Sequence, residues 1–147
     1  MIKTVLYFHG FASSSDSKKA KVFKKYISSL NKRIKVIVPD LNNNFKDAVE
    51  EINQLIKTNQ KPVAFVGSSL GGYYAAYFSS LNKAKAVLIN PATPPLKGFD
   101  IYLGNNTNYS TGEEFTLTKK DIQFLGFLWL LMQFHFPLIG YKFPDKF

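Results

Sequence analysis

The sequence contains no cysteine, which excludes disulfide bonds, thiolate nucleophiles and zinc sites with sulfur ligands. It has only two histidines, His9 and His135, so few imidazoles are present for acid–base chemistry. A glycine-rich dinucleotide loop and a Walker lysine are missing as well. We therefore expect neither a metal nor a cofactor in this chain.

Long apolar runs are also few. The run Val5–Phe8 near the N-terminus is too short for the core of a signal peptide, and we expect a cytoplasmic protein. The densest run, residues 124–139, is shorter than the roughly 20 residues of a membrane-spanning helix. Gln133, His135 and Pro137 also interrupt it. A buried or interfacial helix is favoured over a spanning one, a truncated or frame-shifted ending explains the run better than either, and we expect no membrane contact.

Acidic residues are scarce, since 10 Asp and Glu stand against 19 Lys and Arg, and the net charge is +9. Much of the positive charge lies between Lys18 and Lys35, where apolar side chains from Phe23 to Leu30 recur at helical spacing. This pattern predicts an amphipathic helix with a solvated lysine face. Attraction to phosphate or anionic lipid is the alternative. The aromatic–basic interleaving of nucleic-acid modules is absent, and we expect no nucleic-acid partner.

The length of 147 residues and the 46% of hydrophobic residues predict one folded domain. Four short apolar runs alternate with helical patterns, which predicts a mostly parallel sheet covered by helices on both faces. The fold class is therefore a three-layer α/β/α fold. The expected strands are Thr4–Phe8, Lys35–Val38, Val63–Val66 and Ala86–Ile89, and the expected helices begin near Lys18 and cover Asp47–Lys57 and Leu70–Ser80.

After the fourth strand the pattern is less regular. Residues 92–114 are rich in Gly, Pro and Asn, which predicts loops. Thr116–Leu125 is expected to be a helix with Thr118 as its cap and Asp121 in its first turn. The composition changes again after Gln123. We expect a core at 1–123 and a divergent apolar and aromatic tail at 124–147.

The pentapeptide Gly67-Ser68-Ser69-Leu70-Gly71 stands between the third strand and the helix that follows. A strand, a sharp turn with a serine at its apex and a helix have the geometry of a nucleophile elbow. The backbone at such an apex is strained, so the residues two positions away on either side must be small. Gly67 and Gly71 satisfy this condition, and Ser69 is the candidate nucleophile. A plain Gly/Ser turn or a phosphate-binding loop is the alternative.

A serine hydroxyl needs a base to accept its proton and hydrogen-bond donors to hold the oxyanion. The backbone N–H of Leu70, directly after the nucleophile, is one candidate donor. The second is the N–H of Phe11, because His9-Gly10-Phe11 follows the first strand, where many α/β hydrolases carry a His-Gly motif. His9 precedes the nucleophile in the sequence, and we expect it to shape this loop rather than to act as the base.

With these residues in view, the chain resembles the small YqiA-type esterases of the α/β-hydrolase superfamily. The resemblance implies a carboxylester or thioester hydrolase with a serine, aspartate and histidine triad and no metal. It also implies that Ser69 is the nucleophile and that Phe11 and Leu70 form the oxyanion hole. The resemblance extends to about Thr118 and rests on Leu6–Ser14, Val66–Tyr77, Val87–Ala92 and Tyr102–Phe115.

The resemblance does not reach residues 124–147. In this family two further strands follow and carry the triad aspartate and histidine, but neither a Gly-Asp segment nor a Gly-Ser-His ending occurs here. We therefore predict a truncated or frame-shifted member that lacks the last two strands and leaves Ala86–Ile89 at the edge of its sheet. Asp121 and His135 keep the chain order of the triad but stand too close in sequence for the elements that separate them in the family.

Three functions remain open. The first is an esterase lineage with an intact elbow and no base, which is nearly inactive because loss of triad members leaves only roughly 10³-fold acceleration over water. The second is an active serine hydrolase that uses His135, His9 or a histidine of a partner chain. The third is a non-enzymatic protein that binds membrane surfaces through residues 124–147. A small ester or thioester is the expected partner in the first two cases.

Overall fold

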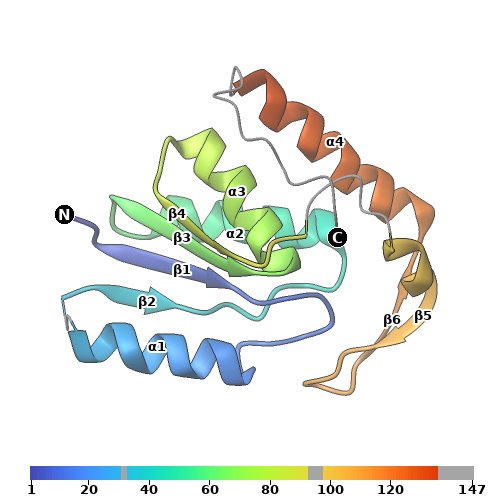
Figure 1. Cartoon of the computed structure of the whole chain (residues 1–147), viewed down its shortest axis with the longest axis horizontal. Helices are drawn as coiled ribbons and strands as arrows, with labels where there is room; N and C mark the ends of the chain where they lie inside the picture. The colour runs from blue at the N-terminus through green and yellow to red at the C-terminus, as the bar shows by residue number, and fades with distance from the viewer. Residues whose placement is uncertain (31–32, 93–97, 136–147) are drawn as a thin grey trace.

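The computed structural model describes residues 1–30, 33–92 and 98–135. Its centre is a sheet of four parallel strands in the order β2-β1-β3-β4 (Figure 1). All four predicted strands are present, which confirms the parallel α/β architecture. The strands are β1 (Thr4–Phe8), β2 (Lys35–Ile37), β3 (Val63–Ser68) and β4 (Ala86–Ile89).

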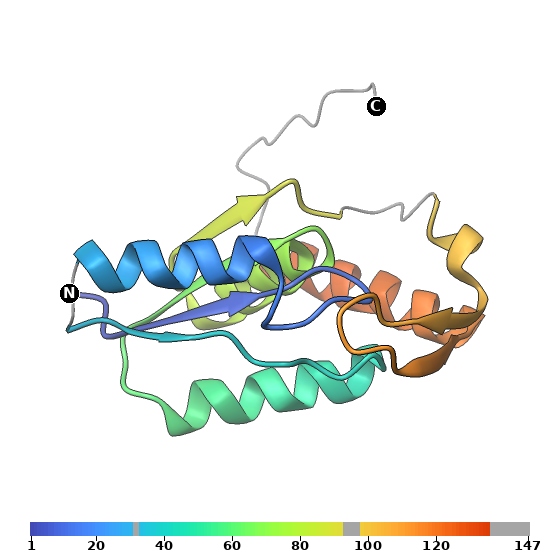
Figure 2. The same ribbon diagram turned by 90° about the horizontal axis from the view of Figure 1, so that it is seen from below.

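Helices cover both faces of the sheet, because the central strands are apolar on both sides. On one face Ala20 packs in a cluster with Tyr7. On the other face Leu6 packs in a second cluster with Ile52 and Phe78. Figure 2 shows α1 and α2 on opposite sides of the strands, which is the predicted three-layer order. The helices are α1 (Lys18–Leu30) on the first face and α2 (Phe45–Thr58) and α3 (Leu70–Asn82) on the second.

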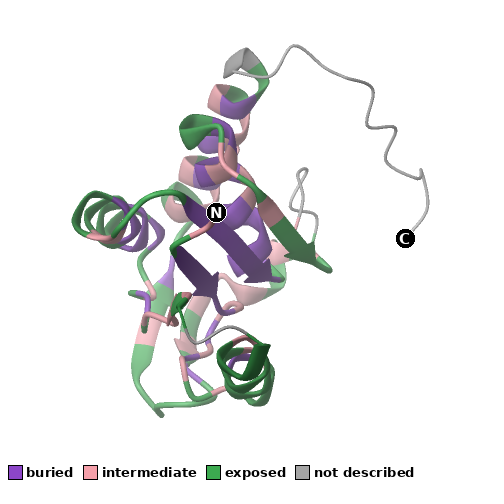
Figure 3. Cartoon of the chain, turned by 90° about the vertical axis from the view of Figure 1, so that its left-hand side faces the viewer, coloured by how far each residue is buried: buried purple, intermediate pink, exposed green. Residues whose placement is uncertain are grey.

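β4 forms one edge of the sheet, as predicted for Ala86–Ile89. Val66 of β3 is buried, whereas its partner in register, Val87 of β4, keeps 59% of its surface exposed. Leu88 and Ile89 also remain more than a third exposed, at 43% and 37%. Figure 3 shows the contrast between the buried central strands and this edge.

The loop predicted over 92–114 is wrong in its second half, while residues 93–97 lie outside the described part. The chain forms a short 3-10 helix, η1 (Phe99–Tyr102), and an antiparallel hairpin of β5 (Gly104–Thr107) and β6 (Glu114–Leu117). Gly and Asn are poor strand formers, so β5 gives no strand signal. A polar cross-strand contact supports the pairing instead, since the Thr116 hydroxyl donates to Asn105 Oδ1 at 2.9 Å.

The helix predicted over Thr116–Leu125 starts and ends later, as α4 (Lys119–His135). Thr118 is its cap, as predicted, and forms a reciprocal pair of hydrogen bonds with Asp121. The Thr118 N–H donates to the Asp121 carboxylate at 2.8 Å, and the Asp121 N–H donates to the Thr118 hydroxyl at 3.4 Å. The start is later because the two residues before Thr118 pair in β6. α4 continues through position 123, so the structure has no element boundary where the sequence analysis divides the chain.

α4 packs on the same side of the sheet as α2 and α3. Leu125, Leu128 and Met132 are buried in the core that these helices share. The Tyr73 hydroxyl of α3 donates to the carbonyl of Leu125. Among the described residues, no helix is long and apolar enough to span a bilayer. The rest of the predicted tail, residues 136–147, lies outside the description.

Candidate active site

Ser69 stands at the apex of the turn between β3 and α3. Its backbone has φ 55° and ψ −120°, which residues with a side chain rarely adopt. The Ser69 N–H donates to the carbonyl of Ile89 at 3.1 Å, and the Ser69 carbonyl accepts the N–H of Ala92 at 2.9 Å. Ser69 is exposed, although Ser68 and Leu70 on either side are buried. Its hydroxyl makes no hydrogen bond to any described residue.

Two glycines allow this turn to close. A Cβ on Gly67 would lie 1.9 Å from the carbonyl oxygen of Gly71. A Cβ on Gly71 would lie 2.1 Å from the carbonyl oxygen of Phe8. Both distances are far inside van der Waals contact, and backbone atoms of packed elements cannot retreat as a flexible side chain can. The predicted need for small residues on both sides of Ser69 is therefore confirmed.

The loop after β1 lies next to Ser69. A Cβ on Gly10 would lie 3.5 Å from Ser69 Cβ and 4.0 Å from Ser69 Oγ. Phe11 follows in this loop, and Leu70 is the first residue of α3. In residues 1–30, 33–92 and 98–135 the backbone N–H groups of Phe11 and Leu70 find no acceptor. Phe11 thus lines the same cavity as Ser69, whereas Leu70, the next residue after Ser69, is not among the described residues of that lining.

His9 is buried at the end of β1, and both of its ring nitrogens are engaged. Nε2 accepts the N–H of Leu41 at 3.1 Å, so the proton lies on Nδ1, which donates to the carbonyl of Gly10 at 2.9 Å. Burial lowers the pKa of His9 below its ordinary value. His9 therefore ties the β1 loop to the segment after β2, which is the geometry of a loop-shaping residue. Neither nitrogen is open to the proton of Ser69.

A cavity of about 430 Å³ opens in front of Ser69. Its lining includes the hydroxyl residue Ser13, the aromatic residues Phe99, Tyr102 and Tyr109, and the basic residues Lys18 and Lys19. A larger cavity of about 590 Å³ lies at the opposite end of the strands. None of the described residues that line it is a Ser, Thr, His or acidic residue. We therefore assign the candidate active site to the smaller cavity.

The ring of Phe11 is the centre of an aromatic cluster that the sequence analysis did not predict. Its centroid lies 5.0 Å from that of Tyr102 and 5.6 Å from those of Phe99 and Phe115. Because these partners belong to η1 and β6, the cluster joins the hairpin to the β1 loop. Phe11 meets its partners from far away in the sequence, so no local pattern could have indicated the cluster.

Asn108 attaches the hairpin to the same loop. It is buried, and its Nδ2 donates to the carbonyl of Ser13 at 3.0 Å, while its Oδ1 accepts two N–H groups of its own turn. Beside it the Tyr109 N–H donates to the carbonyl of Ala12 at 2.8 Å. The Asn and Gly residues of 104–112 were a visible sequence signal for a turn, but the partners of Asn108 were not.

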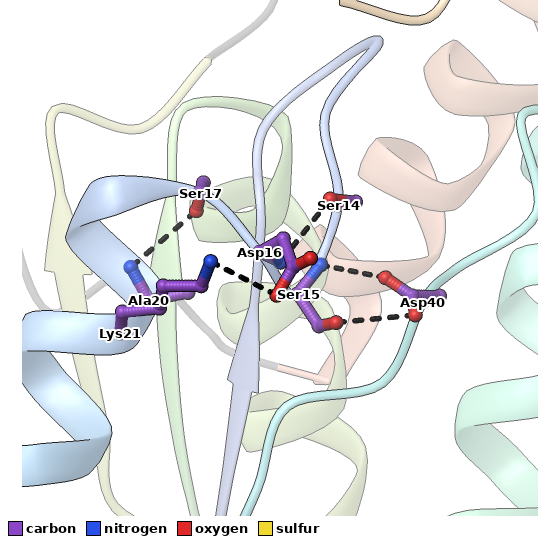
Figure 4. A network of polar contacts seen from close by, with 7 residues as sticks. All are labelled: Ser14, Ser15, Asp16, Ser17, Ala20, Lys21 and Asp40. Atoms are coloured by element: carbon purple, nitrogen blue, oxygen red, sulfur yellow. Dashed lines mark hydrogen bonds and ion pairs between the residues drawn. The ribbon is translucent and has the colours of Figure 1, made fainter. Parts of the chain in front are cut away.

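Polar contacts also fix the segment that leads from the β1 loop into α1 (Figure 4). Asp40, which follows β2, accepts the Ser15 N–H at 2.6 Å and the Ser15 hydroxyl at 3.1 Å. The Ser17 hydroxyl accepts an N–H of the first turn of α1 at 3.4 Å. Lys21 pairs with Asp16 at 3.2 Å. These contacts determine where α1 begins relative to Ser69.

Of the two residues with the chain order of a triad, only the Asp121 side chain is described, and it does not line the cavity of Ser69. Asp121 caps α4 and is absent from the cavity lining. His135 is the last residue of α4, and its side chain lies outside the description, so its role stays a prediction. In the described part of the chain, no three His, Asp or Glu side chains gather as metal ligands.

Comparison with known sequences identifies the family. Residues 4–129 match the profile of the uncharacterised protein family UPF0227. A UPF0227 protein of Shewanella woodyi (strain ATCC 51908 / MS32) is 27% identical over 95 residues, which cover 62% of this chain and 52% of that protein. The chain therefore spans about half the length of this curated relative.

Solved structures agree with the fold. The mouse alpha/beta hydrolase domain-containing protein 10 has a TM-score of 0.57 at 17% identity and is matched over 85% of this chain and 61% of its own. A metagenome-derived lipolytic enzyme has a TM-score of 0.51 at 15% identity, over 91% of this chain and 66% of its own. At these identities the likeness shows the α/β-hydrolase fold and not the activity. The profile match covers most of the sequence, and the chain belongs to the UPF0227 family.

Proposed function

We propose that this chain binds carboxylesters or thioesters and that Ser69 is the nucleophile that takes their acyl group. The observation that carries the proposal is the exposed Ser69 at a positive φ, held by backbone contacts and close-packed glycines. Strain of this kind persists only where the surrounding structure enforces it, and it concentrates at functional sites. The lipolytic enzyme of similar fold adds support by analogy only.

In this proposal Ser69 Oγ attacks the acyl carbon, and the electron pair of the carbonyl moves onto its oxygen. The N–H groups of Phe11 and Leu70 donate hydrogen bonds to that oxyanion. Ser69 Oγ gives up its proton to an acceptor as its bond to the acyl carbon forms. Collapse of the oxyanion then breaks the bond to the alcohol or thiol, which takes a proton from that acceptor as it leaves. Water then attacks the Ser69 ester, releases the carboxylic acid and restores the hydroxyl.

The rate of this reaction is limited by the transfer of the Ser69 proton to an acceptor. His9 is engaged at both nitrogens, and the described lining of the cavity contains no second imidazole. We therefore take solvent as the acceptor of the proton, which makes turnover slow. An activated ester acylates Ser69 faster than the resulting serine ester is hydrolysed. The reason is that the leaving group of the activated ester departs more readily than the Ser69 alkoxide.

A burst experiment with p-nitrophenyl acetate tests the proposal. Rapid mixing is expected to release about one nitrophenolate per chain, followed by a slow phase, because the acylated serine accumulates. Ser69→Ala should remove the burst. Ser13→Ala deletes a hydroxyl that lines the same cavity and should retain the burst. Equal release by Ser69→Ala and by the unaltered protein would contradict the proposal.

The pH dependence of the burst identifies the proton acceptor. With solvent in that role, the burst rate rises about tenfold per pH unit across neutral pH. A histidine whose side chain lies outside the description, or one of a partner chain, would give a plateau above about pH 7. His135→Gln would remove the plateau if His135 is the base. Ser69 remains the proposed nucleophile with either profile. A plateau would contradict the proposal that solvent accepts the proton and that turnover is slow.

A further inference from the structure

The charged side chains in the described lining of the cavity in front of Ser69 are all basic. Lys18 and Lys19 belong to this lining, and none of the described residues that line the cavity is Asp or Glu. Both lysines are exposed, and neither makes an ion pair or hydrogen bond to a described residue. Lys21, on the same first turns of α1, is by contrast paired with Asp16. Within the described residues, neither of the two cavity lysines is therefore paired with an acidic side chain.

The lysines reach this position because of how α1 begins. The loop that carries Phe11 leads into α1, whose first two residues are Lys18 and Lys19. α1 starts at the end of the sheet where β1 and β3 end, as Figure 2 shows. The bonds of Ser15 to Asp40 fix the path of the chain just before the helix. Lys18 and Lys19 thus line the same cavity as Ser69.

We propose that the ester taken by this site carries a negatively charged group, which Lys18 and Lys19 bind while the ester carbonyl faces Ser69. The inference rests on the proposed function and narrows its substrate to acidic esters, such as the half-ester of a dicarboxylic acid. Phe99 and Tyr102 line the same cavity and provide apolar contact for the carbon chain between the two polar ends.

The expected size of the effect is modest. Each contact between exposed charges contributes little to the free energy of binding, and salt weakens it by screening. We therefore expect about fivefold tighter binding of an acidic ester than of a neutral one at low salt. The preference should fall below about twofold in concentrated salt, where the Debye length is a few ångströms.

Binding to the Ser69→Ala variant separates this inference from the chemistry, because that protein cannot be acylated at Ser69. The probes are monomethyl adipate, which carries a carboxylate, and its neutral amide of the same length. NMR titrations at low and at high salt measure the two dissociation constants. The result expected is the fivefold preference at low salt and its loss at high salt.

Two pairs of substitutions in the Ser69→Ala protein test whether Lys18 and Lys19 cause the preference for the acidic ester. Lys18→Gln with Lys19→Gln should remove the preference. Lys24→Gln with Lys25→Gln takes the same charge from the same helix outside the cavity lining and should leave it unchanged. Equal binding of the two probes, binding of neither, or a preference that survives the first pair would overturn the inference. A missing nitrophenolate burst with an intact preference would count against the proposed function alone.

Discussion

Ser69 keeps an unfavourable backbone conformation because its neighbours leave the turn no other path. Its N–H and its carbonyl are both bonded to the segment that follows β4, at Ile89 and Ala92. Gly67 and Gly71 pack their backbones so closely that even one methyl group has no room. At the scale of single residues, the candidate site is therefore built by glycines and main-chain hydrogen bonds, and the side chain of Ser69 is left exposed.

Substitution of Gly71 tests this packing. Gly71→Ala should lower the free energy of unfolding by about 2 kcal/mol or more, because its Cβ would meet the carbonyl oxygens of Phe8 and His9 at 2.1 and 2.4 Å. Gly126→Ala is the matched control, since a Cβ on this helical glycine of α4 would meet nothing within 4 Å. It should raise the stability by up to about 1 kcal/mol. Urea unfolding measures both, and equal effects would contradict the packing described.

The buried His9 predicts a pH dependence of stability. Its pKa is lowered by burial, so the unfolded chain takes up this proton first as the pH falls below about 6.5. Stability should therefore be full above pH 6.5 and decline toward pH 5.5, by at most about 1.4 kcal/mol per pH unit for one group. Protonation would also remove the acceptor of the Leu41 N–H.

Denaturant midpoints at pH 7.5 and 5.5 measure this decline. His9→Gln should be less stable at pH 7.5 and should lose most of the dependence in this window. His135→Gln, which removes the other imidazole of the chain, should retain it. A decline that is unchanged in His9→Gln would show that other groups cause it.

At the scale of elements, α4 is joined to α3 by apolar packing and one buried tyrosine. The Tyr73 hydroxyl donates to the carbonyl of Leu125 and also interacts with the backbone of Trp129. Its neighbour Tyr74 is fully buried, yet its hydroxyl has no partner among the described residues. Two adjacent tyrosines therefore differ in the one feature that decides the energetic value of a buried hydroxyl.

Removal of the Tyr73 hydroxyl should lower the free energy of unfolding, whereas removal of the Tyr74 hydroxyl should not. Tyr73→Phe is expected to cost about 1 kcal/mol of unfolding free energy, because it deletes a buried hydrogen bond between α3 and α4. Tyr74→Phe should be neutral or stabilising, because it removes a buried polar atom that has no partner. Thermal unfolding of the two variants under the same conditions measures the order. A Tyr74→Phe variant less stable than Tyr73→Phe would contradict the assignment.

The sequence predicted the elements whose pattern is local. Four apolar runs bounded by turn residues indicated the strands, and the spacing within residues 67–71 indicated the elbow. The β5–β6 hairpin was missed because polar contacts such as that of Asn105 with Thr116 leave no alternation of apolar residues. The end of α4 was placed too early because its apolar residues surround the helix without a clear period. The aromatic cluster of Phe11 required the tertiary structure.

At the scale of the whole molecule, several separate elements border one cavity. The β1 loop, the start of α1, the elbow and η1 all contribute to its lining. β4 is an edge strand and pairs with β3 alone among the described strands. Its residues Val87 and Ile89 remain exposed. The family resemblance implies two further strands at this edge. Ile89 bonds to Ser69, so the elbow lies beside the open edge.

Covalent modification by a fluorophosphonate, located by intact-mass and peptide mass spectrometry, tests the role of Ser69 most directly. The account predicts about one adduct per chain, on Ser69, formed faster as the pH rises. Ser69→Ala should give none, and Ser13→Ala should react like the unaltered protein. An adduct on another residue, or a folded protein that stays unmodified after long exposure at alkaline pH, would contradict the claim that Ser69 is the nucleophile.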